Sequence, residues 1–444
     1  MRQLAVVSLI LLAAVTDVAA NGRPPNTSTI NFKQGNEQEI AAGMTFGLLL
    51  SHDGGATWHW MCEKTVGYGG MYDPDYVYTP AGSLFATTFD GLKKMTNGCT
   101  FDATPPGTDF VSTTTLGPDG AVYYAAADPP DLMTSDPGDS NIYKSVNDGA
   151  TFPTTAMPGM INDWWQSLEV APSDPLRVYL TGYRLNGSTK TFLMFKSANG
   201  GTSYTAMSQT GIVTATNSTI EIAGISKIDP QELYIRVTLE NNNIGDGIYR
   251  SINGGASWTH ILSKDAGIAF VVRSNGDLVA GTQTVGSFVS HDKGATWVPL
   301  TGAPHINCLV ENAAHEVWAC TQNFGSPGVP PDDAGIMKTT DLATWTKVLR
   351  YQDIQGPVEC AAGTAQHDDC LPMWCGLKNL LGITADPTSC PPMTTGDDTV
   401  GGDGTGTKDP KGCCDASGEG GPTALAISSL VGMVLLRTRR RRAA

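Results

Sequence analysis

The octapeptide SHDGGATW at residues 51–58 returns almost unchanged as SHDKGATW at residues 290–297. The same pattern, S-x-D-x-G-x-T-W, describes the segments that begin at residues 145 (SVNDGATF), 197 (SANGGTSY) and 251 (SINGGASW). Two degenerate copies begin at residues 94 (KMTNGCTF) and 338 (KTTDLATW). The seven starts are 39 to 54 residues apart, which is typical of the blades of a β-propeller.

Each copy stands between two apolar runs, such as FGLLL before residue 51 and WHWM at residues 58–61. Asp or Asn followed by Gly between such runs is a strong hairpin signal, because the Asp or Asn side chain bonds the turn's own backbone and Gly supplies a positive φ. The aromatic residue that ends each copy is large enough to pack between neighbouring sheets. We therefore expect the octapeptides to be hairpin turns and not ligand sites.

These copies resemble the Asp-box (BNR) repeats of sialidases, sortilin-type receptors and photosystem-assembly-factor-like propellers. The resemblance implies an all-β, seven-bladed propeller over residues 21–355, with each box between the third and fourth strands of a blade, far from any active centre. Blade one looks short, so we expect its missing strand to come from the segment after Lys347. The structural box residues are Asp53, Trp58, Asn147, Phe152, Asn199, Tyr204, Asn253, Trp258, Asp292, Trp297 and Trp345.

Both ends of the chain read as targeting segments. Residues 1–20 have the charged start, apolar core and small-residue end of a signal peptide. Residues 413–444 combine Cys413 and Cys414, a short apolar stretch and terminal arginines, and they resemble the MYXO-CTERM sorting signal. That resemblance implies a short transmembrane helix, processing by a sorting protease and display at the cell surface. An ordinary membrane anchor is the alternative.

The cysteine count indicates an oxidising compartment. Eight cysteines precede the C-terminal signal, an even number that favours disulfides in an exported chain. Cys308 and Cys320 are expected to pair, since they flank two predicted strands joined by a turn. The other six are Cys62, Cys99, Cys360, Cys370, Cys375 and Cys390.

Two segments follow the predicted propeller. Residues 356–392 form a small Cys-rich segment, in which LPMWCGLKNLL has helical apolar spacing and a stop at Gly382. Residues 393–412 are a Gly-, Asp- and Thr-rich stretch that we expect to be a disordered linker.

Composition and motifs exclude several classes of function. The chain carries a net charge of −15, which disfavours binding to nucleic acid. No zinc-type cysteine spacing, EF-hand, phosphate loop or hydrolase motif occurs, so neither a metal nor a cofactor is expected. A sialidase would need a Phe/Tyr-Arg-Ile-Pro stretch and three free arginines, and the chain lacks the stretch.

The predicted function is binding of an extracellular glycan or protein at the axial ends of the blades. The alternative is a glycoside hydrolase, sialidase-like or of another type, that acts on extracellular polysaccharide. Aromatic side chains there would contact the ligand, and a hydrolase would need two facing carboxylates. The candidate binding residues are Tyr72, Tyr76, Trp164 and Trp165, and the candidate acids are Asp73, Asp75 and Asp163.

Overall fold

The computed structural model describes residues 23–390, apart from residues 71, 108, 129–137, 188, 241–244, 265–266 and 388–389. The predicted signal peptide, the linker at 393–412 and the sorting signal with Cys413 and Cys414 lie outside the described residues. Within the described ranges, no helix is both long and apolar enough to cross a membrane.

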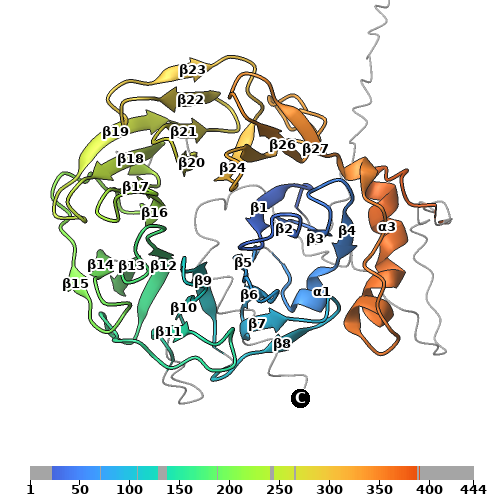
Figure 1. Ribbon diagram of the computed structural model, residues 1–444, viewed down its shortest axis with the longest axis horizontal. Helices are drawn as coiled ribbons and strands as arrows, with labels where there is room; N and C mark the ends of the chain where they lie inside the picture. The colour runs from blue at the N-terminus through green and yellow to red at the C-terminus, as the bar shows by residue number, and fades with distance from the viewer. Residues whose placement is uncertain are drawn as a thin grey trace, which may run out of the picture. The chain divides into compact units, whose positions relative to one another are not determined.

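Seven antiparallel sheets stand around a common axis and form the predicted seven-bladed β-propeller (Figure 1). Six sheets have four strands, and the third has three strands plus a single bridge from Tyr143 to Thr154 in the place of the fourth. Consecutive strands pair within each blade, so the first strand of every blade lines the axis. In chain order the blades are β1 (Thr27–Phe32), β2 (Ile40–Met44), β3 (Gly47–Ser51), β4 (His59–Met61); β5 (Tyr76–Tyr78), β6 (Leu84–Thr88), β7 (Gly91–Met95), β8 (Phe101–Ala103); β9 (Val111–Leu116), β10 (Val122–Ala126), β11 (Ile142–Ser145); β12 (Asp163–Val170), β13 (Val178–Asn186), β14 (Thr189–Ser197), β15 (Thr205–Ala206); β16 (Ile220–Ile225), β17 (Leu233–Val237), β18 (Asp246–Ser251), β19 (Thr259–Lys264); β20 (Ala269–Val272), β21 (Leu278–Gly281), β22 (Ser287–Ser290), β23 (Val298–Leu300); and β24 (Ile306–Glu311), β25 (Val317–Thr321), β26 (Ile336–Thr339), β27 (Thr346–Leu349).

The hydrophobic core consists of separate clusters between neighbouring blades. Strands such as β2 and β10 are buried along their whole length, because both faces of each sheet pack against another sheet. Between the second and third blades, for example, Phe85 and Val122 pack with Phe152, the last residue of a box. The aromatic residues of the boxes therefore help to fill the gaps between sheets, as the sequence predicts.

All seven octapeptides lie in the turn between the third and fourth strands, or in the equivalent place in the third blade. We call these segments box turns. Ser51 Oγ accepts a hydrogen bond from Gly55 N (2.9 Å) and donates one to Asp53 Oδ1 (2.9 Å), and Asp53 accepts from the amide (2.9 Å) and hydroxyl (2.7 Å) of Thr57. The five copies that match the pattern well share the hydrogen bonds of the first Ser. The polar groups of each turn therefore bond to one another within the turn.

The two degenerate copies are one residue shorter than expected. Asn97 Oδ1 accepts from Thr100 N (2.9 Å) and Asp341 Oδ1 from Thr344 N (2.8 Å), three residues on, whereas Asp53 and Asp292 reach four residues on. The predicted starts at residues 94 and 338 are therefore wrong by one position. Each of these two turns begins one residue later, and the lysine belongs to the strand before it.

A second feature repeats along the chain, namely a basic residue directly before the box turn. In five blades it pairs across the sheet with an aromatic residue of the second strand, and two of these bases bond to the next blade. Lys196 Nζ donates to Gly254 O (2.5 Å), and Lys94 Nζ donates to Asp148 Oδ2 (3.1 Å). The box turns thus hold neighbouring blades together. The pairs are Lys94–Phe85, Lys144–Tyr123, Lys196–Tyr179, Arg250–Tyr234 and Lys338–Trp318.

The prediction that blade one borrows a strand from the segment after Lys347 is wrong. Blade one is complete, because β1 supplies its inner strand and pairs with β2 from Thr27 to Phe32. Residues 355–358 instead lie outside β4, where Trp60 N donates to Gly356 O (2.9 Å) and Val358 N donates to Trp60 O (2.8 Å). The apparent shortness arose because TSTINF is polar and does not read as a buried strand.

The ring is closed by side chains, disulfides and the backbone bonds of residues 355–358 to β4, and not by exchange of a blade strand. Thr27 and Tyr351 share a hydrogen bond (2.9 Å), and Phe32 packs edge-on against Trp318 of the last blade (5.1 Å between ring centroids). After the last strand, the chain crosses to blade one and ends in helix α3 (Leu371–Leu381), which stops at Gly382 as predicted and lies beside β4 (Figure 1). Trp374 of α3 packs on Trp60.

Four disulfides occur among the described residues, and the predicted pairing of Cys308 with Cys320 is confirmed. Cys375 pairs with Cys390, which secures the end of α3. The other two are Cys62–Cys370 and Cys99–Cys360, and we call them the ring-closing disulfides, because they join the first two blades to the segment after the last. Four disulfides in one domain indicate a protein that folds outside the reducing cytoplasm.

Candidate functional site

The two faces of the propeller differ in what they display. The box turns and the turns between first and second strands form one face, which we call the box face. The connections between blades and the turns between second and third strands form the opposite face, which we call the connector face. All predicted site residues lie towards the connector face.

The box face offers carboxylates that are already satisfied. Hydrogen bonds from the hydroxyl and amide of Thr296 lower the pKa of Asp292 to about 2, so this group stays ionised and bonded to its own turn. Asn147, Asn199 and Asn253 take the same position in three other box turns. The box turns hold the fold together and provide no reactive group.

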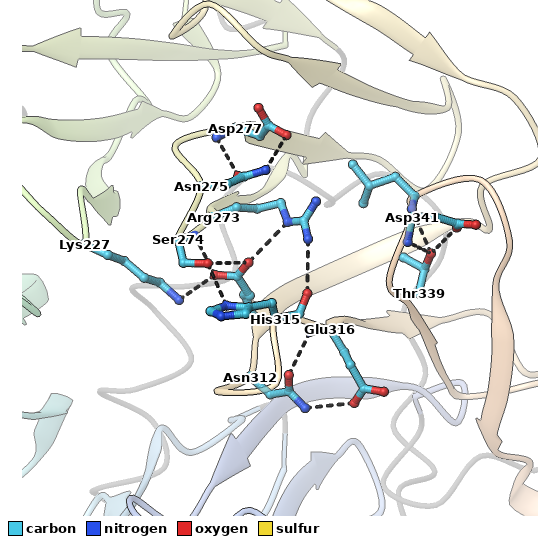
Figure 2. A network of polar contacts seen from close by, with 12 residues as sticks. Lys227, Arg273, Ser274, Asn275, Asp277, Asn312, His315, Glu316, Thr339 and Asp341 are labelled. Atoms are coloured by element: carbon cyan, nitrogen blue, oxygen red, sulfur yellow. Dashed lines mark hydrogen bonds and ion pairs between the residues drawn. The ribbon is translucent and has the colours of Figure 1, made fainter.

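Near the axis, the box face carries a network that joins three blades (Figure 2). The fully buried Glu311 carboxylate pairs with Lys227 Nζ (2.9 Å) and Arg273 Nε (3.2 Å), and it accepts a bond from Ser274 N (2.7 Å). His315 Nδ1 contacts Ser274 Oγ (2.8 Å). The first–second strand turns of blades five, six and seven are tied together by these contacts.

Two of the predicted acids are held in ion pairs with arginines. Asp73 makes a bidentate pair with Arg23 (2.8 and 2.9 Å). The Asp163 side chain is completely buried, pairs with Arg184 (2.5 and 2.7 Å) and accepts a bond from Met160 N (2.7 Å). Both residues organise the connections that precede inner strands, and their role as candidate acids stays a prediction.

Two of the four predicted aromatic residues are also unavailable to a ligand. Trp165 is completely buried, and its Nε1 donates to Ser140 O (2.8 Å). Tyr76 is 4% exposed and belongs to the core between the first two blades. Tyr72 and Trp164 are half-buried, so their rings are open to contact on the connector face.

Tyr72 and Trp164 belong to a continuous set of rings across blades two to four, which we call the aromatic row (Tyr72, Phe89, Phe110, Trp164 and Tyr183). Successive rings from Phe89 to Phe110, Trp164 and Tyr183 have centroids 5.1, 5.4 and 6.4 Å apart and are inclined by 24°, 36° and 23°. Tyr72 contacts Phe89 (4.8 Å). At the Tyr183 end of the row, Lys190 Nζ lies 4.5 Å from the Tyr183 ring centroid.

An exposed apolar loop borders the aromatic row. Met157, Met160 and Ile161, in the connection before β12, are 43%, 60% and 44% exposed. Apolar side chains gathered at one place on a soluble protein commonly mark an interaction site. The sequence alone does not reveal this loop or the roles of Phe89, Phe110 and Tyr183, because the rings come from separate segments and meet only in the folded propeller.

Two carboxylates, Asp75 and Glu221, lie on the connector side of inner strands, and a third, Glu169, lies near the box-face end of β12. Burial raises the pKa of Asp75 to about 6, and the charge of Glu221 adds to this rise. Burial likewise raises the pKa of Glu169 to about 7, with a further contribution from the charge of Asp75. Thr115 of β9 donates to Glu169 (3.1 Å). Of the predicted acids, Asp75 is the one whose pKa burial raises, and the carboxylates that interact with it, Glu169 and Glu221, are not predicted from the sequence.

Arg236 is a basic side chain at this end of the axis. Its Nη2 donates to Glu221 Oε2 (2.5 Å) and its Nη1 donates to Ile268 O (2.8 Å). Glu221 and Arg236 are cross-strand neighbours in β16 and β17 and form one wall of a recess of about 200 Å³. Within the described ranges, no group of three or more His, Cys, Asp or Glu side chains is placed to hold a metal ion.

Fold and site together define a seven-bladed β-propeller with an aromatic and acidic connector face. No protein-family model and no curated protein matches the chain. Similar solved structures include the extracellular domain of BT4673 from B. thetaiotaomicron (13% identity, TM-score 0.47, covering 67% of this chain and 37% of that one) and an ancestral GH74 enzyme (14%, 0.48, 66% and 43%). YCF48 from Cyanidioschyzon merolae is similar at 13% identity and a TM-score of 0.43, covering 67% of this chain and 93% of that one. The chain thus spans less than half the length of the first two, and the likeness concerns the fold alone.

Proposed function

We propose that the protein is an exported β-propeller that binds an extracellular glycan on its connector face, over blades two to five. The observation that carries this proposal is the aromatic row, a continuous set of ring contacts from three blades in which Tyr72, Phe89 and Trp164 are half-buried. Sugar rings present an apolar face that stacks on such side chains, and their hydroxyls need nearby donors and acceptors. Glu221 and Arg236 supply both kinds of group.

Binding is tested by applying the purified protein to a glycan array and measuring hits by calorimetry. Trp164→Ala is expected to weaken binding at least tenfold, because it removes the central ring of the row. Trp297→Ala, which removes an aromatic residue of a box turn, is the matched control and should leave affinity unchanged. Absence of any glycan ligand would overturn the proposal and favour a protein partner for the exposed loop at residues 157–161.

A second candidate, glycoside hydrolysis, is favoured by one observation. Glycosidases use a protonated and an ionised carboxyl group. Burial raises the pKa of Asp75 to about 6 and that of Glu169 to about 7, and the charge of Asp75 adds to the rise at Glu169. Release of reducing sugar from any bound glycan, abolished by Asp75→Asn or by Glu169→Gln, would make the protein an enzyme. Binding without turnover would leave it a binding protein.

We further propose that the exported protein is displayed on the cell surface through its C-terminal segment. The support is the sequence of residues 413–444 and the oxidised cysteines of the propeller. Replacing Cys413 and Cys414 with alanine should trap the full-length chain in the inner membrane. Unchanged surface display of this variant would contradict the sorting role.

A further inference from the structure

The recess between blades five, six and seven has the size of a site for one small ring. It has a volume of about 200 Å³ and is lined from β16, β17, β20 and β24. Sites for drug-sized ligands occupy roughly 300–1,000 Å³, so this recess is suited to a smaller group. Its position at the axial ends of three inner strands places it on the same face as the aromatic row.

The walls of the recess are polar on one side and apolar on the other. Glu221 and Arg236 form the polar wall, where Thr219 also donates to Glu221 Oε1 (3.1 Å). Phe270 and Leu309 are apolar lining residues contributed by blades six and seven. A carboxylate and a guanidinium side by side accept and donate hydrogen bonds, as each hydroxyl group of a sugar also does.

The charge around the recess disfavours a negatively charged ligand. Arg236 is already committed to Glu221 and to a backbone carbonyl, so it has no unbalanced charge to offer. Asp75 lies close enough to Glu221 for the two charges to interact, so a second carboxylate stands near the recess. A ligand carboxylate would meet this field without a free cation to balance it.

We propose that this recess is a subsite for a single neutral pyranose residue, and that the protein discriminates against sugars that carry a carboxylate. The inference rests on the proposed glycan binding and adds its specificity. The pyranose places its hydroxyls on Glu221 and Arg236 and its apolar face against Phe270 and Leu309. The aromatic row contacts other residues of the same glycan.

The test compares pairs of glycans that differ only in a carboxylate, namely galactose- and galacturonate-terminated, glucose- and glucuronate-terminated, and lactose and sialyllactose. Binding of the purified full protein is measured by calorimetry at pH 8, where Asp75 and Glu169 are ionised. The neutral member of at least one pair is expected to bind at least tenfold more tightly than its acidic partner. Equal or tighter binding of the acidic members would overturn the subsite while leaving glycan binding in place.

Two variants assign the discrimination to the recess. Ala223→Leu fills it, and should weaken binding of the neutral glycan at least tenfold; Ala198→Leu, an exposed box-face position, is the matched control. Glu221→Gln leaves the charge of Arg236 unbalanced, and should therefore reduce the ratio of the affinity for the neutral glycan to the affinity for its acidic partner. Unchanged affinity of a folded Ala223→Leu variant would overturn the subsite, whereas failure of every glycan to bind wild-type protein would overturn the proposed function as well.

Discussion

Removal of the two ring-closing disulfides should loosen the propeller at one place, the junction of its first and last blades. The perturbation is replacement of Cys62, Cys99, Cys360 and Cys370 by alanine. Without these bonds, noncovalent contacts alone hold the junction closed, among them the packing and hydrogen bonds around Thr27, Phe32 and Trp60, because no strand is exchanged there. Blades three to five do not touch it and should keep their packing.

The size of the effect follows from the loops that the disulfides close. Cys99 and Cys360 are 261 residues apart. A crosslink across a loop of that length lowers the entropy of the unfolded chain, which raises the free energy of unfolding by about 5–6 kcal/mol. With that bond in place, Cys62–Cys370 closes a loop of roughly 47 residues, which adds about 4 kcal/mol. The unfolding entropy of a domain of this size is about 0.8 kcal/mol/K, so Tm should fall by about 12 °C.

The assay combines calorimetry with hydrogen exchange, and the control is replacement of Cys308 and Cys320 by alanine. Those two cysteines are 12 residues apart within one blade, so their loss should cost about 3 kcal/mol, or about 4 °C. In the ring variant, β1 and β24 should lose exchange protection before any other inner strand. An equal fall of Tm in both variants, with uniform loss of protection, would refute the account of ring closure.

Three further predictions concern a buried acid, the blade contacts and the binding face. Glu169→Gln should raise the stability of the protein at pH 8 by about 1–3 kcal/mol and change it little at pH 4. The reason is that a carboxyl whose pKa is raised to about 7 stabilises the folded state below its ordinary pKa, and this contribution is lost as the pH rises through 7. A variant less stable than wild type at pH 8 would contradict this. Lys196→Met should cost about 1–2 kcal/mol in urea unfolding, because it removes the bond to Gly254 of the next blade, whereas the exposed Lys347→Met should cost less than about 0.5 kcal/mol; equal costs would show that the blade contact adds nothing. Trp164→Ala should leave Tm within a few degrees of wild type while abolishing glycan binding, and a large loss of Tm would instead make this ring part of the core.

The repeated octapeptide made the fold predictable from sequence, because a turn that satisfies its own hydrogen bonds needs a fixed set of residues. The copies at residues 94 and 338 were misplaced by one residue, since sequence matching does not show that a shorter turn bonds three residues on. The polar inner strand of blade one was missed for a related reason. A strand that lines an axis need not be apolar.

The candidate site was less predictable, because its residues are defined by partners far away in the sequence. Asp73 and Asp163 stand where inner strands begin, as active-site acids would, but Arg23 and Arg184 neutralise them. Trp164 and Trp165 are adjacent in sequence and lie on opposite sides of their strand, so one is open to a ligand and the other is buried. Single-sequence patterns do not record either distinction.

The most direct test of the central claim is the hydrogen-exchange footprint of a bound glycan. The account predicts protection on the connector face, in the segments around Tyr72, Phe110, Trp164, Glu221 and Phe270, with no change in the seven box turns. Protection confined to the box turns, or a glycan array with no ligand at all, would contradict it.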